Sequence, residues 1–167
     1  MKSIALGGFM GTGKSTVGPR LAQKLGMPFH DLDLLIEQHA QMTIPQIFQG
    51  RGEPAFRAIE SAILADVAAR PPQVLALGGG TLHQPPNLPI LTEHFHVIVL
   101  DARWETLLGR LSERAAQGRP LWPQAKALYR RRRPGYLRAG ASAGTVVSVD
   151  ERSPQQVVDA ILQVLPA

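Results

Sequence analysis

Cysteine is absent from the 167-residue chain. Its absence excludes disulfide bonds, cysteine-ligated zinc and a thiol nucleophile, and it is typical of a protein in a reducing compartment. Long apolar runs are missing as well, because none approaches the roughly 20 residues that a helix needs to span a bilayer. The first eight residues, MKSIALGG, lead directly into a strand-like pattern and leave no room for a signal or transit peptide. We therefore expect a cytoplasmic protein without a membrane partner.

Acidic residues are the minority, with 13 Asp and Glu against 18 Lys and Arg and a net charge of +5. The excess is concentrated in residues 103–138, which contain ten Lys or Arg but only two Glu. Such a segment is typical of a site for a multiply charged small anion, and a nucleic-acid groove is the alternative. We favour the small anion and expect no nucleic-acid partner, because a helix would spread the arginines of 130–133 around its circumference.

Short strand-like runs alternate with longer helical ones along the chain. Nearly continuous apolar runs indicate parallel strands buried on both faces. The strand-like segments are 3–8, 28–33, 74–80, 95–101 and 145–150. One helix is predicted to end at Gly26, another to run through Phe56 to near residue 70, and a last one to begin at the N-cap Ser153. The alternation predicts an α/β fold with a parallel sheet, and no linker divides residues 1–167 into more than one domain.

Residues 8–15, GFMGTGKS, match the phosphate-loop pattern G-x-x-x-x-G-K-[ST] at every fixed position, with a strand pattern before and a helical one after. Glycines let successive backbone N–H groups point at a phosphate, Lys14 reaches the β- and γ-phosphates, and the Ser15 hydroxyl is a ligand for Mg²⁺. A glycine-rich turn capped by Ser15 is the structural alternative. We predict a nucleotide site formed by Gly11, Thr12, Gly13, Lys14, Ser15 and Thr16.

The acceptor of the phosphoryl group is left open by this motif and could be water, a nucleotide or a small metabolite. Asp31 and Asp33 follow the second predicted strand, where ligands bind in open α/β sheets. One carboxylate could face a metal ion and the other an acceptor hydroxyl. Equally, Asp31 could be the N-cap of the next helix and Asp33 a first-turn carboxylate favoured by the helix dipole.

Two further patterns each allow a functional and a structural interpretation. Arg57 and Glu60 are three residues apart on a predicted helix, a spacing that allows an ion pair, and such pairs are usually surface contacts. Gly78–Gly80 close the third predicted strand, where glycines either permit a close approach to the backbone or form a loose turn.

Taken in order, these motifs resemble the shikimate kinase family. The resemblance rests on GFMGTGKSTVG at 8–18, DLD at 31–33, F-x-x-x-G-E-x-x-F-R-x-x-E at 48–60, GGG at 78–80, GRPLW at 118–122, R-x-P-x-Y at 132–136 and ERSPQQVVDAIL at 151–162. It implies a single-domain P-loop kinase with a five-stranded parallel sheet in the order 2-3-1-4-5, flanked by helices. It also implies an acceptor-binding region at about 31–61 and a mobile lid at about 113–124.

The family transfers the γ-phosphate of ATP to the 3-hydroxyl of shikimate, in aromatic biosynthesis. The resemblance implies that Asp33 is the base or positioner of the acceptor and that Asp31 helps to hold Mg²⁺ through water. It implies that Arg57 and Arg132 bind the shikimate carboxylate, that Glu60 orients Arg57, and that the Gly79 backbone binds a ring hydroxyl. A monomer is the family expectation.

On the nucleotide side, the resemblance identifies Arg119 as the lid arginine and Arg152, with Pro154, as flanking adenine. Arg114 is our candidate for a second lid arginine. Among the four arginines at 130–133, Arg132 is chosen because Pro134 and Tyr136 fix the spacing. The chain departs from the family where it has Gln41 in place of the usual glycine, followed by Pro45, so we expect a reshaped helix near 41–47.

Two other functions compete with this interpretation. Another small-metabolite P-loop kinase, such as a gluconate kinase, would keep the phosphate loop but need a different acceptor clamp. A nucleotide-dependent switch or nucleic-acid binder would transfer no phosphate to a small acid, and salt would weaken its binding to DNA or RNA.

Overall fold

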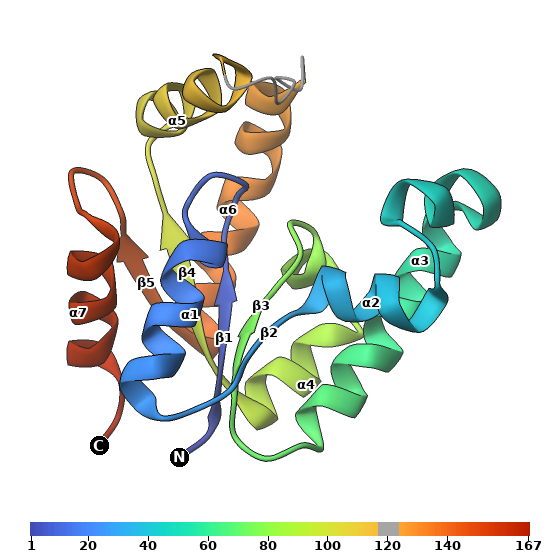
Figure 1. Cartoon of the computed structure of the whole chain (residues 1–167), viewed down its shortest axis with the longest axis horizontal. Coiled ribbons are helices and arrows are strands. Elements are labelled where there is room, and N and C mark those ends of the chain that lie inside the picture. Colours follow the sequence, from blue (N-terminus) through green and yellow to red (C-terminus); the bar gives the residue numbers. More distant parts are fainter. Residues whose placement is uncertain (117–123) are drawn as a thin grey trace.

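A computed structural model describes residues 1–116 and 124–167 (Figure 1). Its centre is a sheet of five parallel strands in the order β2-β3-β1-β4-β5, as predicted. The strands are β1 (Ser3–Gly7), β2 (Phe29–Asp31), β3 (Val74–Ala76), β4 (Phe95–Asp101) and β5 (Gly144–Ser148). All five residues of β1 are buried, which explains its apolar run, because a central parallel strand is covered on both faces.

Helices connect the strands and cover the sheet. They are α1 (Lys14–Leu25), α2 (Leu32–Ala40), α3 (Ile44–Ala68), α4 (Asn87–His94), α5 (Trp104–Ala116), α6 (Ala125–Ala143) and α7 (Pro154–Val164), with the short 3₁₀ helix η1 (Thr81–His83) after β3. Helix α1 packs with α7 in front of the sheet in Figure 1, whereas α6 passes behind it against β4 and β5. No helix in the described part of the chain is both long enough and apolar enough to cross a membrane.

Three predicted strands end two or more residues earlier than the sequence suggested, and one of them, β5, ends at Ser148 and not at residue 150. The segment 28–33 leaves extended structure at Asp31, because the Asp31 carboxylate accepts a hydrogen bond from the Leu34 N–H and caps α2. The segment 74–80 leaves it after Ala76, because Gly78–Gly80 turn the chain into η1. Asp33 therefore lies in the first turn of a helix, at the same end of the sheet as the third strand's glycines.

The predicted helix ends are confirmed where capping signals marked them. Gly26 has φ 65° and ends α1 in the left-handed conformation that glycine favours. Ser153 caps α7 in a capping box with Gln156. The helix through Phe56 ends at Ala68, two residues before its expected limit.

The segment around Gln41 is a junction between two helices. Gln41 itself adopts φ 52° and ψ 35° and ends α2 in the left-handed region. Thr43 then caps α3, and Pro45 occupies the first turn of that helix, where its missing N–H costs no intrahelical hydrogen bond. Gln41 thus supplies the turn between α2 and α3, and α3 itself is kinked at Gly52, which has φ 82° and ψ 168°.

Candidate active site

A polar cavity of about 720 Å³ opens at the carboxyl ends of the parallel strands. It is lined from seven helices or strands and the loops between them. The lining residues include Gly11, Thr12, Gly13, Lys14, Ser15, Thr16, Asp31, Asp33, Gly79, Arg110, Arg132, Arg152 and Pro154. Helix α1 starts directly beneath it, with its positive end toward the cavity. The structure therefore gathers residues from most of the chain at one end of the sheet.

The phosphate loop joins β1 to α1 in a left-handed curl. Gly8, Gly11 and Gly13 have φ values of 132°, 83° and 102°, which residues with a Cβ rarely adopt. Thr12 is buried, and its hydroxyl donates to the Phe9 carbonyl at 2.7 Å, so this side chain holds the shape of the loop. Gly13 caps α1, and its carbonyl accepts from the Val17 N–H at 2.8 Å.

Lys14 is the charged group of the loop. Its ammonium group donates to the carbonyls of Gly8 and Phe9, the second at 3.2 Å. Burial lowers the pKa of Lys14 to about 8, although Asp33 and Asp31 oppose that shift. A phosphate in the loop would add negative charge beside the ammonium group and favour its protonated form.

Asp33 faces the same cavity from α2. Burial, together with the negative charges of Asp31 and Glu60, raises the pKa of Asp33 to about 6, and Lys14 opposes the shift. Asp31 lines the cavity too while capping α2, so the structural interpretation of Asp31 is correct and does not exclude a second role. Among the described residues, no three His, Cys, Asp or Glu side chains come together as a metal site.

Two arginines converge on the three glycines after β3. A Cβ placed on Gly79 would lie 2.7 Å from Arg132 Nη1, and one placed on Gly80 would collide with the Arg57 guanidinium. The run of glycines is therefore where arginine side chains approach the backbone, as the first of its two interpretations requires. Arg132 lines the cavity, whereas Arg57 contacts the glycines from α3 and is not among the cavity-lining residues.

Arg57 is held by a buried carboxylate. Its Nη1 donates to Glu60 Oε1 at 3.0 Å, and Glu60 is fully buried. The other Glu60 oxygen accepts a hydrogen bond from the Thr81 hydroxyl at 2.9 Å. The pair is thus not a surface contact. Thr81 is a supporting residue that the sequence analysis missed, since a threonine after three glycines carries no signal of its own.

The four arginines of α6 are separated by the structure. Arg132 faces the cavity, Arg133 pairs with Asp101, and Arg130 and Arg131 are exposed. This arrangement agrees with the choice of Arg132 from its spacing to Pro134 and Tyr136. The Tyr136 hydroxyl donates to the Gly79 carbonyl, which ties the R-x-P-x-Y segment to the glycines.

On the nucleotide side, Arg152 and Pro154 line the cavity, and Arg152 Nη1 donates to the Ser148 carbonyl at 2.9 Å. That they flank adenine stays a prediction. Arg119 lies outside the described residues, as does most of the expected lid, and only the backbone of Arg114 is described, within α5. Arg110, which was not predicted as a site residue, lines the cavity and donates from Nη1 to the Gly11 carbonyl at 2.8 Å. Its position one helical turn before Arg114 was the available signal.

The site combines a phosphate loop, a buried lysine, a carboxylate and a pair of arginines. This combination defines a P-loop phosphotransferase that acts on a small anionic acceptor. Comparison with known proteins identifies the family. The shikimate kinase family model matches residues 10–166. Shikimate kinases from two Synechococcus strains, CC9605 and CC9902, are 40% and 43% identical over 172 residues, covering 99% of this chain and 83% and 86% of the relatives. The chain belongs to the shikimate kinase family, and phosphorylation of shikimate by ATP is its activity.

Solved structures agree with this assignment. A shikimate kinase from Acinetobacter baumannii in complex with shikimate is 34% identical, with a TM-score of 0.84 and coverage of 98% of this chain and 92% of that one. The enzyme from Aquifex aeolicus vf5 is also 34% identical, with a TM-score of 0.78 over 96% of this chain and 94% of that one. A gluconokinase from Sinorhizobium meliloti 1021 shares the fold, with a TM-score of 0.67, at only 20% identity over 97% of this chain and 90% of that one.

Proposed function

We propose that the γ-phosphate of ATP passes to the 3-hydroxyl of shikimate between the phosphate loop and the glycines after β3. The observation that carries this proposal is the position of Lys14, Asp33 and Arg132 on one cavity. The lysine supplies positive charge for the phosphates, the aspartate an acceptor for a proton, and the arginine a partner for a carboxylate. One O–P bond forms at the hydroxyl as the bond from the γ-phosphorus to the bridging oxygen of ADP breaks.

The nucleotide phosphates bind in the loop of Gly11–Thr16, where backbone N–H groups and the start of α1 favour negative charge. Arg152 and Arg110 line the same cavity, and Arg110 donates to the Gly11 carbonyl of the loop. We assign these two arginines to the rest of the nucleotide. We assign Arg119 to the lid at about 113–124, where it would neutralise charge that develops during transfer.

Mg²⁺ fits the donors that the cavity offers. Ser15 and Asp31 both present oxygen to it, and Mg²⁺ in kinases keeps several waters and takes few protein ligands beside the substrate phosphates. A site with one hydroxyl and one carboxylate agrees with the lack of a larger acidic cluster among the described residues. When bound, the ion would neutralise charge on the phosphates; Asp31 would reach it through water.

Shikimate binds by its charge and its hydroxyls, because it offers little apolar surface. Arg57 and Arg132 hold its carboxylate, Gly79 offers its backbone to a ring hydroxyl, and the buried Glu60 fixes the plane of the Arg57 guanidinium. Such a site rejects analogues that leave its buried polar groups unpaired. Gluconate has no ring, so its hydroxyls are not fixed relative to its carboxylate as the hydroxyls of shikimate are.

Asp33 positions the 3-hydroxyl and accepts its proton as the phosphoryl group arrives. A carboxyl with a pKa near 6 is mostly ionised at neutral pH and is a stronger base than an ordinary aspartate. We place this reaction in the cytoplasm, the compartment that supplies ATP, and we propose that the working unit is a monomer, as the family resemblance implies.

A coupled assay for ADP release tests the proposed function, with shikimate, quinate and gluconate as alternative acceptors at equal concentration. We expect rapid release with shikimate and release near the background hydrolysis rate with gluconate. Quinate controls for the ring and the carboxylate, which it shares with shikimate. Release with gluconate and none with shikimate would contradict the proposal and favour another metabolite kinase of this fold.

A further inference from the structure

Arg132 lies in a run of four arginines, and the helix alone does not decide which of them faces the acceptor. Successive residues of a helix point about 100° apart, so a modest rotation of α6 would move the guanidinium of Arg132 away from the glycines. Something outside the helix must fix that rotation. The contacts of Arg133, the next residue, do so.

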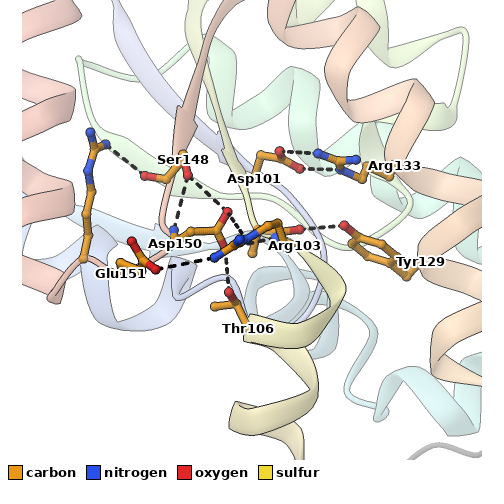
Figure 2. Close-up of polar contacts among 10 residues, drawn as sticks. Asp101, Arg103, Thr106, Tyr129, Arg133, Ser148, Asp150 and Glu151 are labelled. Carbon is orange, nitrogen blue, oxygen red and sulfur yellow. Dashed lines mark hydrogen bonds and ion pairs between the residues drawn. The ribbon is translucent and has the colours of Figure 1, made fainter.

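Arg133 makes a bidentate ion pair with Asp101, the last residue of β4. Its Nε donates to Asp101 Oδ1 at 2.9 Å and its Nη2 to Asp101 Oδ2 at 2.8 Å (Figure 2). Two parallel hydrogen bonds fix both the distance and the plane of the guanidinium, which a lysine could not do. Because the Asp101 side chain is only 17% exposed at the end of a buried strand, the pair anchors α6 to the carboxyl end of β4.

A second contact holds the preceding turn of α6 to the same segment. The Tyr129 hydroxyl donates to the Ala102 carbonyl at 2.7 Å, and the Arg133 guanidinium lies 6.0 Å from the centre of the Tyr129 ring. Figure 2 shows both side chains reaching from α6 toward the end of β4. Two adjacent turns of the helix are thus tied to residues 101 and 102.

On the acceptor side, α6 is tied to η1 and the glycines. His83 Nε2 lies 2.9 Å from the Arg132 carbonyl, which can only accept, so this nitrogen carries the proton of the ring. The Tyr136 hydroxyl donates to the Gly79 carbonyl. Arg132 therefore lies between two sets of anchors, with Asp101 on one side and the acceptor loop on the other.

We propose that the Arg133–Asp101 pair is a positioning device that sets the rotation of α6 and points Arg132 at the acceptor. Arg133 then controls affinity for shikimate without contacting it. This inference rests on the proposed function of Arg132 as a partner of the shikimate carboxylate. An ordinary surface ion pair would contribute little to stability and nothing to acceptor specificity.

The test is a set of variants measured by kcat/KM for shikimate, which remains measurable when binding is too weak to saturate. For Arg133→Met we expect a fall of about 10- to 100-fold, the usual effect of a small misplacement of a binding group, with the KM for ATP changed less than about 2-fold. Asp101→Asn should lower kcat/KM for shikimate as much as Arg133→Met does. Arg133→Lys should give a value between those of the wild type and Arg133→Met. The matched control is Arg131→Met, an exposed arginine of the same helix, which should leave both constants unchanged.

The decisive step is to introduce Arg133→Met into Arg132→Met. If Arg133 acts through Arg132, the second change causes no further loss of kcat/KM for shikimate. A further loss of similar size, equal losses for shikimate and ATP, or no effect of Arg133→Met alone would overturn the inference. If instead Arg132→Met itself leaves kcat/KM unchanged, the proposed function of Arg132 fails and not only its positioning.

Discussion

At the scale of one residue, the ionised carboxylate of Asp33 serves the reaction but lowers the free energy of unfolding. Its carboxyl lies in the cavity near Asp31 and Glu60, and the combination of burial and like charge raises its pKa to about 6. The folded state therefore binds a proton more tightly than the unfolded chain does between about pH 4 and pH 6. As the pH rises through that window, ionisation of Asp33 lowers the free energy of unfolding.

Replacing Asp33 by Asn should separate activity from stability. We expect kcat to fall by about 10²- to 10⁴-fold, because the amide cannot accept the proton of the hydroxyl, while the KM for ATP changes little. In urea denaturation at pH 7 the variant should gain about 1–2 kcal/mol, a value discounted for the partial exposure of Asp33. The gain should shrink as the pH falls below about 6 and disappear below about pH 4, where the wild-type carboxyl is protonated in both states. Full activity in this variant would contradict the assigned role.

The lowered pKa of Lys14 predicts how the activity depends on pH in the alkaline range. Its pKa near 8 belongs to the free enzyme, so kcat/KM for ATP should fall above about pH 8 as the ammonium group loses its proton. At saturating ATP the bound phosphates favour the charged lysine, and the fall in kcat should move to higher pH. Rate profiles from pH 6 to 10 check this, with background hydrolysis subtracted. Identical upper limbs in the two profiles would show that the phosphates do not face Lys14.

At the scale of elements, the junction of α2 and α3 gives the clearest test of local conformation. Gln41 is exposed and left-handed, which costs an ordinary residue roughly 1–2 kcal/mol, whereas glycine adopts this conformation freely. Because glycine also loses more backbone entropy on folding, we expect Gln41→Gly to stabilise the protein by about 0.5–1 kcal/mol in urea denaturation.

Gln41→Ala is the control for that change, since it removes the same side chain but keeps the Cβ. It should give no gain, and kcat with shikimate should stay within about 2-fold in both variants. Loss of stability in Gln41→Gly would mean that the Gln41 side chain contributes more to the junction than its backbone conformation costs.

The elements also show what sequence patterns can and cannot predict. The phosphate loop, the caps at Gly26 and Ser153 and the apolar strands each depend on neighbours in the chain, so their signals are local and their prediction was confirmed. The ends of β2 and β3 were placed too late, because Asp31 and the glycines stop those strands through contacts that periodicity does not reveal. Arg110 was missed for the same reason, since its partner is the loop almost a hundred residues earlier.

At the scale of the whole molecule, the site forms where the order of the sheet reverses. Strand β1 lies between β3 and β4, so the connections after neighbouring strands lead to opposite sides and leave a crevice at their carboxyl ends. The phosphate loop follows β1, the glycines follow β3, and Asp101 ends β4. The sheet order could be expected only from the family resemblance, because the pairing of distant strands leaves no mark in local sequence.

The most direct test of the central claim is a crystal structure of the protein with a non-hydrolysable ATP analogue, Mg²⁺ and shikimate. We predict that the terminal phosphate lies in the loop of Gly11–Thr16 and that the shikimate carboxylate pairs with Arg57 and Arg132. The 3-hydroxyl should lie within hydrogen-bond distance of Asp33 and point at the terminal phosphorus. Shikimate bound away from these three side chains, with the nucleotide in its loop, would contradict the account.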